Sequence, residues 1–161
     1  MLSTLGLVAA LSSMRTPGTA LPAASLPSLR GPNVALRSLV GAPIVVVIVA
    51  DWCDPCHAGM PSIVAAAARH PAVRFLAIDE LESASRARAF VAATHVPFET
   101  VLLTNGAFSK PGVTDEQRAA TGLDIPAVYV LDRRGVVVRA FVGADAMAGD
   151  KIEAALRALG P

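Results

Sequence analysis

The chain has few aromatic residues and few cysteines. Phe, Trp and Tyr together make up 4% of its 161 residues, whereas hydrophobic residues as a whole make up 53%. The core is therefore expected to be aliphatic and large enough for one domain. The two cysteines are Cys53 and Cys56. Two cysteines in a chain of this length exclude a small secreted fold that is held together by several disulfides.

An excess of charge of one sign is also missing. The 14 basic and 13 acidic residues are interspersed and give a net charge of +1. There is no cluster of Lys and Arg and no basic stripe interleaved with aromatic residues, so we expect no nucleic-acid partner. The apolar runs also fall short of the roughly 20 residues that a membrane-spanning helix needs.

The N-terminal stretch differs in composition from the rest of the chain. Residues 1–13 are apolar without charged side chains, Arg15 follows, and residues 16–28 are rich in Pro, Ala, Ser and Gly. The apolar part is typical of the hydrophobic region of a secretory signal, and residues 20–24 offer small side chains for cleavage. The positive charges that precede such a region are lacking, so an unstructured leader and a truncated anchor are alternatives. We predict a disordered leader over residues 1–28 and a folded domain over residues 29–161.

An apolar run leads directly into the two cysteines. Residues 43–51 are rich in β-branched side chains and predict a buried strand. Residues 55–69 predict a helix with a buried stripe and a kink at Pro61. Cys53 and Cys56 thus lie at a helix N-terminus, where unpaired N–H groups and the helix dipole favour a thiolate. Because this spacing also allows a disulfide across one helical turn, the pair is a candidate redox-active dithiol.

The rest of the chain alternates between strand and helix patterns. The predicted strands are 73–78, 99–103, 127–132 and 136–142, and the predicted helices are 81–94, 114–121 and 146–159. This order predicts an α/β fold with a mixed sheet covered on both faces, parallel central strands and a final antiparallel hairpin. Ligand chemistry in such sheets belongs at the carboxyl ends of the strands, where the cysteines lie. We interpret the acidic run at residues 79–82 as the solvated start of a helix.

These features together resemble one superfamily. The strand, the run Trp52-Cys53-Asp54-Pro55-Cys56, Pro61 in the helix and Ile125-Pro126 before a hairpin are similar to thioredoxin, and more closely to the extracytoplasmic branch typified by TlpA and ResA. The resemblance covers about residue 29 to the end of the chain. It implies a thioredoxin-like three-layer α/β fold with a central mixed β-sheet flanked by helices. It also implies an N-terminal strand extension and an inserted βα element at 97–122.

The resemblance also implies a role for each residue of the motif. Cys53 corresponds to the exposed attacking thiol and Cys56 to the resolving thiol. Pro126 corresponds to a cis-proline that faces the disulfide and helps to present the backbone of the substrate. The residues expected to bind substrate or to shape the site are Trp52, Asp54, Pro55 and Ile125.

The activity that the resemblance implies is thiol–disulfide exchange with disulfide-containing protein substrates, in cytochrome c maturation or a similar reductive task. The exchange needs no cofactor and no metal. A membrane electron donor of the thiol-relay type would return the pair to its reduced form. We expect a monomer outside the cytoplasm, either periplasmic or anchored to the membrane. The alternatives are a thioredoxin-fold assembly factor or chaperone that binds substrate without turnover and, after it, a peroxidase.

The chain departs from the thioredoxin pattern in its acidic residues. Val47 stands where thioredoxin has a buried acid, so the proton acceptor for Cys56 is open. The candidates are Asp51, Asp54, His57 and Glu80. Asp54 is expected to oppose a thiolate on Cys53 by like-charge repulsion. Because the stability of the reduced form sets the potential, we predict a reducing rather than an oxidising pair.

Two other uses of the motif are open from the sequence alone. Cys53-x-x-Cys56-His57 is also the motif for covalent haem attachment, although haem would need a second axial ligand and an aromatic-lined pocket. A purely structural disulfide fits the same two residues. Zinc is a weaker alternative because His70 and His95 are isolated in the sequence and are expected to lie at the surface or to cap helices.

Overall fold

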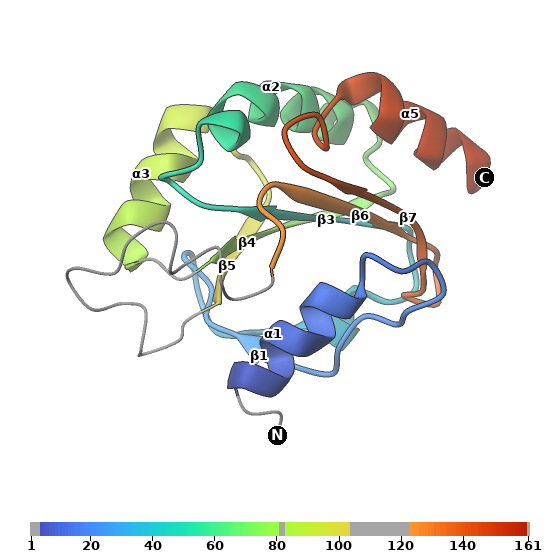
Figure 1. The fold of residues 1–161 in the computed structure, drawn as a ribbon, viewed down its shortest axis with the longest axis horizontal. Coiled ribbons are helices and arrows are strands. Elements are labelled where there is room, and N and C mark those ends of the chain that lie inside the picture. Colours follow the sequence, from blue (N-terminus) through green and yellow to red (C-terminus); the bar gives the residue numbers. More distant parts are fainter. Residues whose placement is uncertain (1–3, 81–82, 104–122, 161) are drawn as a thin grey trace.

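A five-stranded mixed sheet forms the centre of the molecule (Figure 1). The computed structural model describes residues 4–80, 83–103 and 123–160. In the strand order β5-β4-β3-β6-β7, β3 to β5 are parallel, while β6 is antiparallel to β3 and β7 to β6. The strands are β3 (Ile44–Val49), β4 (Arg74–Glu80), β5 (Glu99–Leu103), β6 (Ala127–Leu131) and β7 (Val137–Val142). The predicted mixed sheet and its final hairpin are confirmed.

Three helices cover one face of this sheet (Figure 1), namely α2 (Asp54–Arg69), α3 (Ala84–Thr94) and α5 (Gly149–Ala158). The middle strand β3 is buried along its whole length, which explains its unbroken apolar run. Its odd-numbered valines pack against the helices in one core cluster, together with Met60, Phe90 and Ile152. Helix α2 continues as one helix past Pro61.

The opposite face of the sheet is covered by the N-terminal helix α1 (Thr4–Ser13) (Figure 1). Leu11 and Met14 are completely buried there, in a cluster with Ile44, Val46 and Tyr129 of the sheet. Within the described part of the chain, no helix combines the length and the apolar character that crossing a bilayer requires. Two layers of helix therefore enclose the sheet, as the three-layer prediction requires.

The segment that follows α1 is also part of the fold. The N–H of Gly18 donates to the carbonyl of Val137 at 2.8 Å. The N–H of Val137 in turn donates to the carbonyl of Thr19 at 2.9 Å. Short strand β1 (Ser25–Leu26) then pairs with β2 (Val34–Ala35), which leads into the 3₁₀ helix η1 (Leu36–Leu39). The predicted strand extension is confirmed.

The disordered leader predicted over residues 1–28 is therefore wrong for residues 4–28. The apolar side chains of α1 cover one face of the sheet, and their burial there stabilises the helix. Composition alone did not reveal that face. A role of this segment as an export signal or anchor stays a prediction.

The acidic run was also misread from the sequence. Strand β4 extends to Glu80, and Asp79 and Glu80 are 0% and 1% exposed instead of solvated. The reason is that β4 lies between β3 and β5, and pairing continues from Asp79 to Val49 and from Glu80 to Leu103. Helix α3 accordingly begins at Ala84. The helix predicted at 114–121 lies outside the described residues.

Candidate redox site

The two cysteines lie at the junction of β3 and α2. Cys53 is the N-cap of α2 in an extended backbone conformation (φ −93°, ψ 100°), and its Sγ accepts the backbone N–H of Cys56 at 3.2 Å. Pro55 is in the first turn of the helix, where the missing N–H has no intrahelical acceptor to lose. The predicted change from strand to helix at the cysteines is confirmed.

Cys53 and Cys56 are joined by a disulfide, with their Cα atoms 5.2 Å apart. Cys56 is completely buried and Cys53 is 3% exposed, so the attacking thiol expected at Cys53 is much less exposed than predicted. After reduction, the sulfur of Cys53 lies at the N-terminus of α2, where the helix dipole and free N–H groups stabilise a thiolate. The position suits a thiol that must be nucleophilic.

The cis-proline lies at the same edge of the sheet as the disulfide. The Ile125–Pro126 peptide bond is cis, as the resemblance implied. Strand β6 starts directly afterwards with Ala127, which pairs with Ile48 of β3. Pro126 therefore lies opposite Val49, the last residue of β3, and Cys53 follows Val49 by four residues. The carbonyl of Pro126 accepts the N–H of Gly143 at 3.1 Å, which holds this loop to the end of β7.

The other predicted site residues lie around this junction. Trp52 and Ile125 are partly buried and pack against the core cluster that contains both cysteines. The indole N–H of Trp52 is buried and has no hydrogen-bond acceptor among the described residues. Asp54 and Pro55 are the first two residues of α2, and both are exposed. The structure thus places these side chains at the redox edge, while their roles stay predictions.

The loop that carries the cis-proline is also linked to the N-terminal segment. Asp124 forms an ion pair with Arg15 at 3.6 Å. Tyr129 is completely buried beneath α1, and the charges of Asp124 and Arg15 both act on its phenol. Burial raises the pKa of Tyr129 to about 12, and the carboxylate of Asp124 adds to the rise. The N-terminal segment therefore contacts the loop that carries the cis-proline, and the sequence analysis did not predict this contact.

His57 is fixed by contacts to two neighbouring elements. Its Nε2 atom lies 2.8 Å from the carbonyl oxygen of Asp51 and 3.5 Å from the carboxylate of the same residue. The ring packs edge-on against Phe90 of α3, with centroids 4.8 Å apart. Arg86 of α3 reaches the other oxygen of the Asp51 carboxylate at 3.2 Å. His57 is a candidate from the sequence, but the sequence did not indicate this network of contacts.

The two buried acids of β4 point to opposite faces of the sheet. Successive side chains of a strand point to opposite faces of the sheet. Glu80 therefore points to the same face as Leu76 and Ile78, which lie in the core cluster beneath α1. Glu80, a predicted proton-relay candidate, is therefore across the sheet from the disulfide. Asp79 points to the same face as Ala77, which is the face of the sheet that packs against the cysteines. Sequence reasoning missed Asp79 because the acidic run was assigned to a helix.

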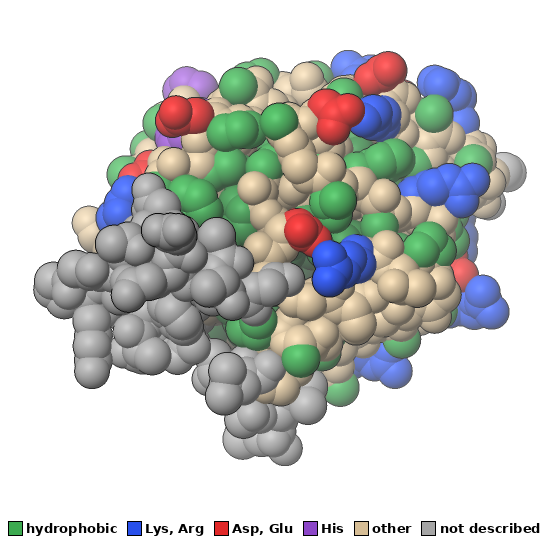
Figure 2. Space-filling view, in the orientation of Figure 1, with side chains coloured by type: hydrophobic (Ala, Val, Ile, Leu, Met, Phe, Trp, Pro, Cys, Tyr) green, Lys and Arg blue, Asp and Glu red, His purple; other side chains and the backbone are tan. Residues whose placement is uncertain are grey.

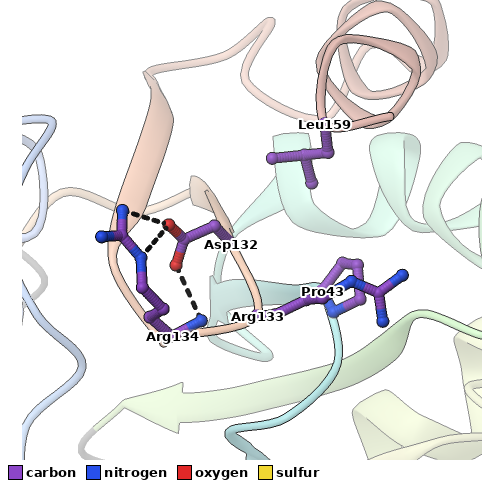
Figure 3. Close-up of a pocket in the computed structure, with 5 residues that line it drawn as sticks. All are labelled: Pro43, Asp132, Arg133, Arg134 and Leu159. Atoms are coloured by element: carbon purple, nitrogen blue, oxygen red, sulfur yellow. Dashed lines mark hydrogen bonds and ion pairs between the residues drawn. The ribbon is translucent and has the colours of Figure 1, made fainter. Parts of the chain in front are cut away.

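Two hollows of the surface lie at opposite ends of the molecule. A shallow groove of about 370 Å³ runs beside the disulfide between α2 and the loop after β7, and its lining includes Pro55, Ala58, Ser62, Ala144 and Met147. A second hollow of about 230 Å³ lies at the far end, between the β6–β7 turn and α5 (Figure 3), lined by Pro43, Asp132, Arg133, Arg134 and Leu159. Lys and Arg side chains gather toward that end in Figure 2. Of these two hollows, the groove is the one next to the disulfide, because Pro55 of the Cys53–Cys56 motif lines it.

The histidines other than His57 cap helices, as predicted. His70 ends α2 and lies 2.7 Å from the carboxylate of Glu153, whose pKa is lowered chiefly by this hydrogen bond. His95 ends α3 in the left-handed conformation (φ 55°). In the ranges that the structure describes, no three His, Cys, Asp or Glu side chains are close enough together to hold a metal ion.

A Cys-x-x-Cys disulfide that caps a helix and shares a sheet edge with a cis-proline defines a thiol–disulfide oxidoreductase of thioredoxin-like fold. The chain belongs to the redoxin family, whose sequence profile matches residues 16–156. A search of curated proteins finds no match to the chain.

Solved structures share the fold of this chain. A secreted Mycobacterium tuberculosis disulfide oxidoreductase homologous to Escherichia coli DsbE is 24% identical, with a TM-score of 0.69 over 85% of this chain and 96% of that one. M. tuberculosis DsbF, solved in mixed oxidised and reduced forms, is 27% identical, with a TM-score of 0.69 over 85% and 95%. StoA from Bacillus subtilis is 17% identical, with a TM-score of 0.61 over 84% and 99%.

Proposed function

We propose that this protein reduces disulfide bonds of protein substrates outside the cytoplasm. The observation that carries the proposal is the placement of the Cys53–Cys56 disulfide at a helix N-terminus, at the same sheet edge as cis-Pro126. An accessible groove adjoins this edge, and we propose that it receives the substrate segment. A disulfide with a purely structural role would need neither the groove nor the cis-proline.

The proposed reaction proceeds in two exchanges. The thiolate of Cys53 attacks a sulfur of the substrate disulfide, so that a mixed disulfide forms and one substrate thiolate leaves. The thiolate of Cys56 then attacks the sulfur of Cys53 and releases the second substrate thiolate. The protein ends as the disulfide described above, and two electrons have passed to the substrate. A membrane electron donor of the thiol-relay type then returns the pair to the dithiol.

The reductive direction rests on the local charges. Asp54 follows Cys53 directly, and its carboxylate opposes a negative charge on that sulfur. A reduced form that is less stabilised gives the pair a lower potential, which makes it a better donor of electrons. The substrate class that fits such a donor is an oxidised Cys-x-x-Cys segment, as in the maturation of cytochrome c.

The location outside the cytoplasm is supported by two observations. The apolar N-terminal residues resemble a secretory signal. One of the similar structures is that of a secreted oxidoreductase. We also propose that the protein acts as a monomer, because Val142 is the one large hydrophobic side chain of the described residues that is well exposed.

Trapping of the mixed disulfide tests this function. A peptide with one internal Cys-x-x-Cys disulfide is incubated with the reduced Cys56→Ser and Cys53→Ser variants, and adducts are detected by non-reducing electrophoresis and mass spectrometry. We expect an adduct with Cys56→Ser, because Cys53 attacks and nothing resolves it. We expect little or none with Cys53→Ser, because Cys56 is completely buried. Equal trapping by both variants would contradict the assigned order of attack.

The reduction potential of the wild-type pair tests the direction. Equilibration with glutathione and dithiothreitol buffers is expected to give a value below about −200 mV. A value near about −120 mV, typical of strong oxidants, would overturn the reductive role. If the peptide binds but no thiol exchange occurs, the chaperone or assembly factor becomes the better assignment.

A further inference from the structure

The imidazole of His57 is held against the redox junction in one orientation. Its Nε2 atom is 2.8 Å from the carbonyl oxygen of Asp51, in the turn that connects β3 to Cys53. Since a carbonyl oxygen accepts hydrogen bonds and does not donate them, Nε2 must carry the hydrogen. The edge-on contact with Phe90 fixes the plane of the ring. The other nitrogen, Nδ1, is then the position at which the ring gains or loses a proton.

The ring can exchange that proton with solvent. The side chain of His57 is 34% exposed, whereas the adjacent residue Cys56 is completely buried. His57 is therefore a solvent-accessible titratable group that directly follows the buried Cys56 in the sequence. Imidazole is the side chain whose charge changes in the neutral pH range.

One carboxylate, that of Asp51, lies against this ring, and Arg86 of α3 is paired with it. The titratable and charged groups of the described elements packed at this junction are Asp51 from the turn, Asp54 from α2, Arg86 from α3, and Asp79 and Glu80 from the end of β4. Glu80 is on the opposite face of the sheet, and Arg86 is engaged with Asp51 at 3.2 Å. Reduction of the disulfide adds one more negative charge, the thiolate of Cys53. His57 follows Cys53 by one helical turn, with its backbone N–H bonded to the carbonyl of Cys53 at 3.2 Å, so a proton on its ring offsets this charge.

We propose that His57 takes up a proton when the Cys53–Cys56 disulfide is reduced, and so couples the redox state of the pair to pH. A dithiol reductant breaks the S–S bond, gives up two electrons and two protons, and becomes a disulfide. One proton goes to the sulfur of Cys56 and the other to Nδ1 of His57, while Cys53 remains as the thiolate. His57 acts through the cysteines without touching the substrate, which makes it a positioning residue. This inference rests on the proposed function.

The equilibrium with glutathione, measured at about pH 6 and about pH 8, tests the coupling. His57→Gln keeps an N–H donor for the Asp51 carbonyl but cannot become charged. At the lower pH we expect its equilibrium to move three- to tenfold toward the disulfide, or about 15 to 30 mV. At the higher pH, which disfavours a charged imidazole, we expect less than a twofold change. The matched control is His95→Asn, since Asn also tolerates the left-handed backbone of His95.

A variant with a permanent charge gives the opposite result. With His57→Lys we expect the equilibrium at the higher pH to move toward the dithiol relative to the wild type, because the side chain keeps its positive charge there. An equal shift of His57→Gln at both pH values, or no shift at either, would overturn the coupling and leave His57 with a structural role. If instead the wild-type pair has no reversible equilibrium with glutathione, it is the proposed function that fails.

Discussion

Replacing Leu11 with Ala tests whether α1 belongs to the folded protein. Leu11 is completely buried between α1 and the sheet, in the cluster that contains Val46 and Tyr129. If the segment were a disordered leader, as its composition suggested, truncating this side chain would change nothing. If α1 covers the sheet as the structure shows, the substitution removes three buried carbons from a packed core.

The expected loss of stability follows from that burial. Three carbons at about 0.8 kcal/mol each give about 2.4 kcal/mol of lost transfer free energy. The cavity left behind brings the total to about 3 to 4 kcal/mol, within the roughly 2 to 5 kcal/mol range of such substitutions. With an m-value of about 2 kcal/mol per molar urea, the unfolding midpoint is lowered by about 1.5 to 2 M.

Urea denaturation of the oxidised protein, followed by circular dichroism, measures this change. The matched control is Ala9→Ser, because Ala9 lies on the exposed side of the same helix. It is expected to change the free energy of unfolding by about 0.5 kcal/mol or less. A loss of less than about 0.5 kcal/mol for Leu11→Ala as well would show that α1 does not contribute to the stability of the fold, and the reasoning would be refuted.

Two further predictions concern Tyr129 and Gly59. Tyr129 is the single tyrosine of the chain, so an ultraviolet absorbance titration should show ionisation near pH 12 in the native protein and near about pH 10 in urea. Because the raised pKa favours the neutral phenol in the fold, its contribution is intact below about pH 10 and is lost between pH 10 and pH 12; native ionisation near pH 10 would contradict the burial. Gly59→Ala places a Cβ 2.6 Å from Cβ of Met147, so we expect a loss of about 1 to 3 kcal/mol in urea denaturation despite the better helix propensity of Ala. In the control Gly149→Ala the nearest atom is 3.5 Å away, and equal stability of the two variants would refute the close packing.

The redox junction was predictable because its signals are local. A β-branched run, two cysteines three positions apart and a proline in the first helical turn each constrain the backbone within a few residues. The helix N-terminus at the cysteines, a disulfide between them and the β6–β7 hairpin are confirmed for this reason. The cis bond at Pro126 is also confirmed, although it followed from family resemblance and not from the residues themselves.

The errors share one cause, which is that the neighbours of a segment in space are far away in the sequence. Asp79 and Glu80 were predicted to be solvated because acidic residues favour water, yet pairing with Val49 and Leu103 places them in β4, inside the sheet. Once β4 is known to continue to Glu80, the alternation of side chains decides the face of each acid. Asp79 is then on the same face of the sheet as the disulfide, and Glu80 is on the opposite face.

Short-range order in the sequence is enough to predict the chemistry of this protein: two thiols at a helix N-terminus with a buried strand before them. Those features depend on the order of residues over short distances. The tertiary structure decided what surrounds them. It placed α1 on the open face of the sheet, joined Arg15 to the loop before Pro126, and brought Asp51, Arg86 and Phe90 around His57. Each of these contacts joins separate elements, because burial and charge pairing depend on which surfaces meet and not on the order of residues along one segment.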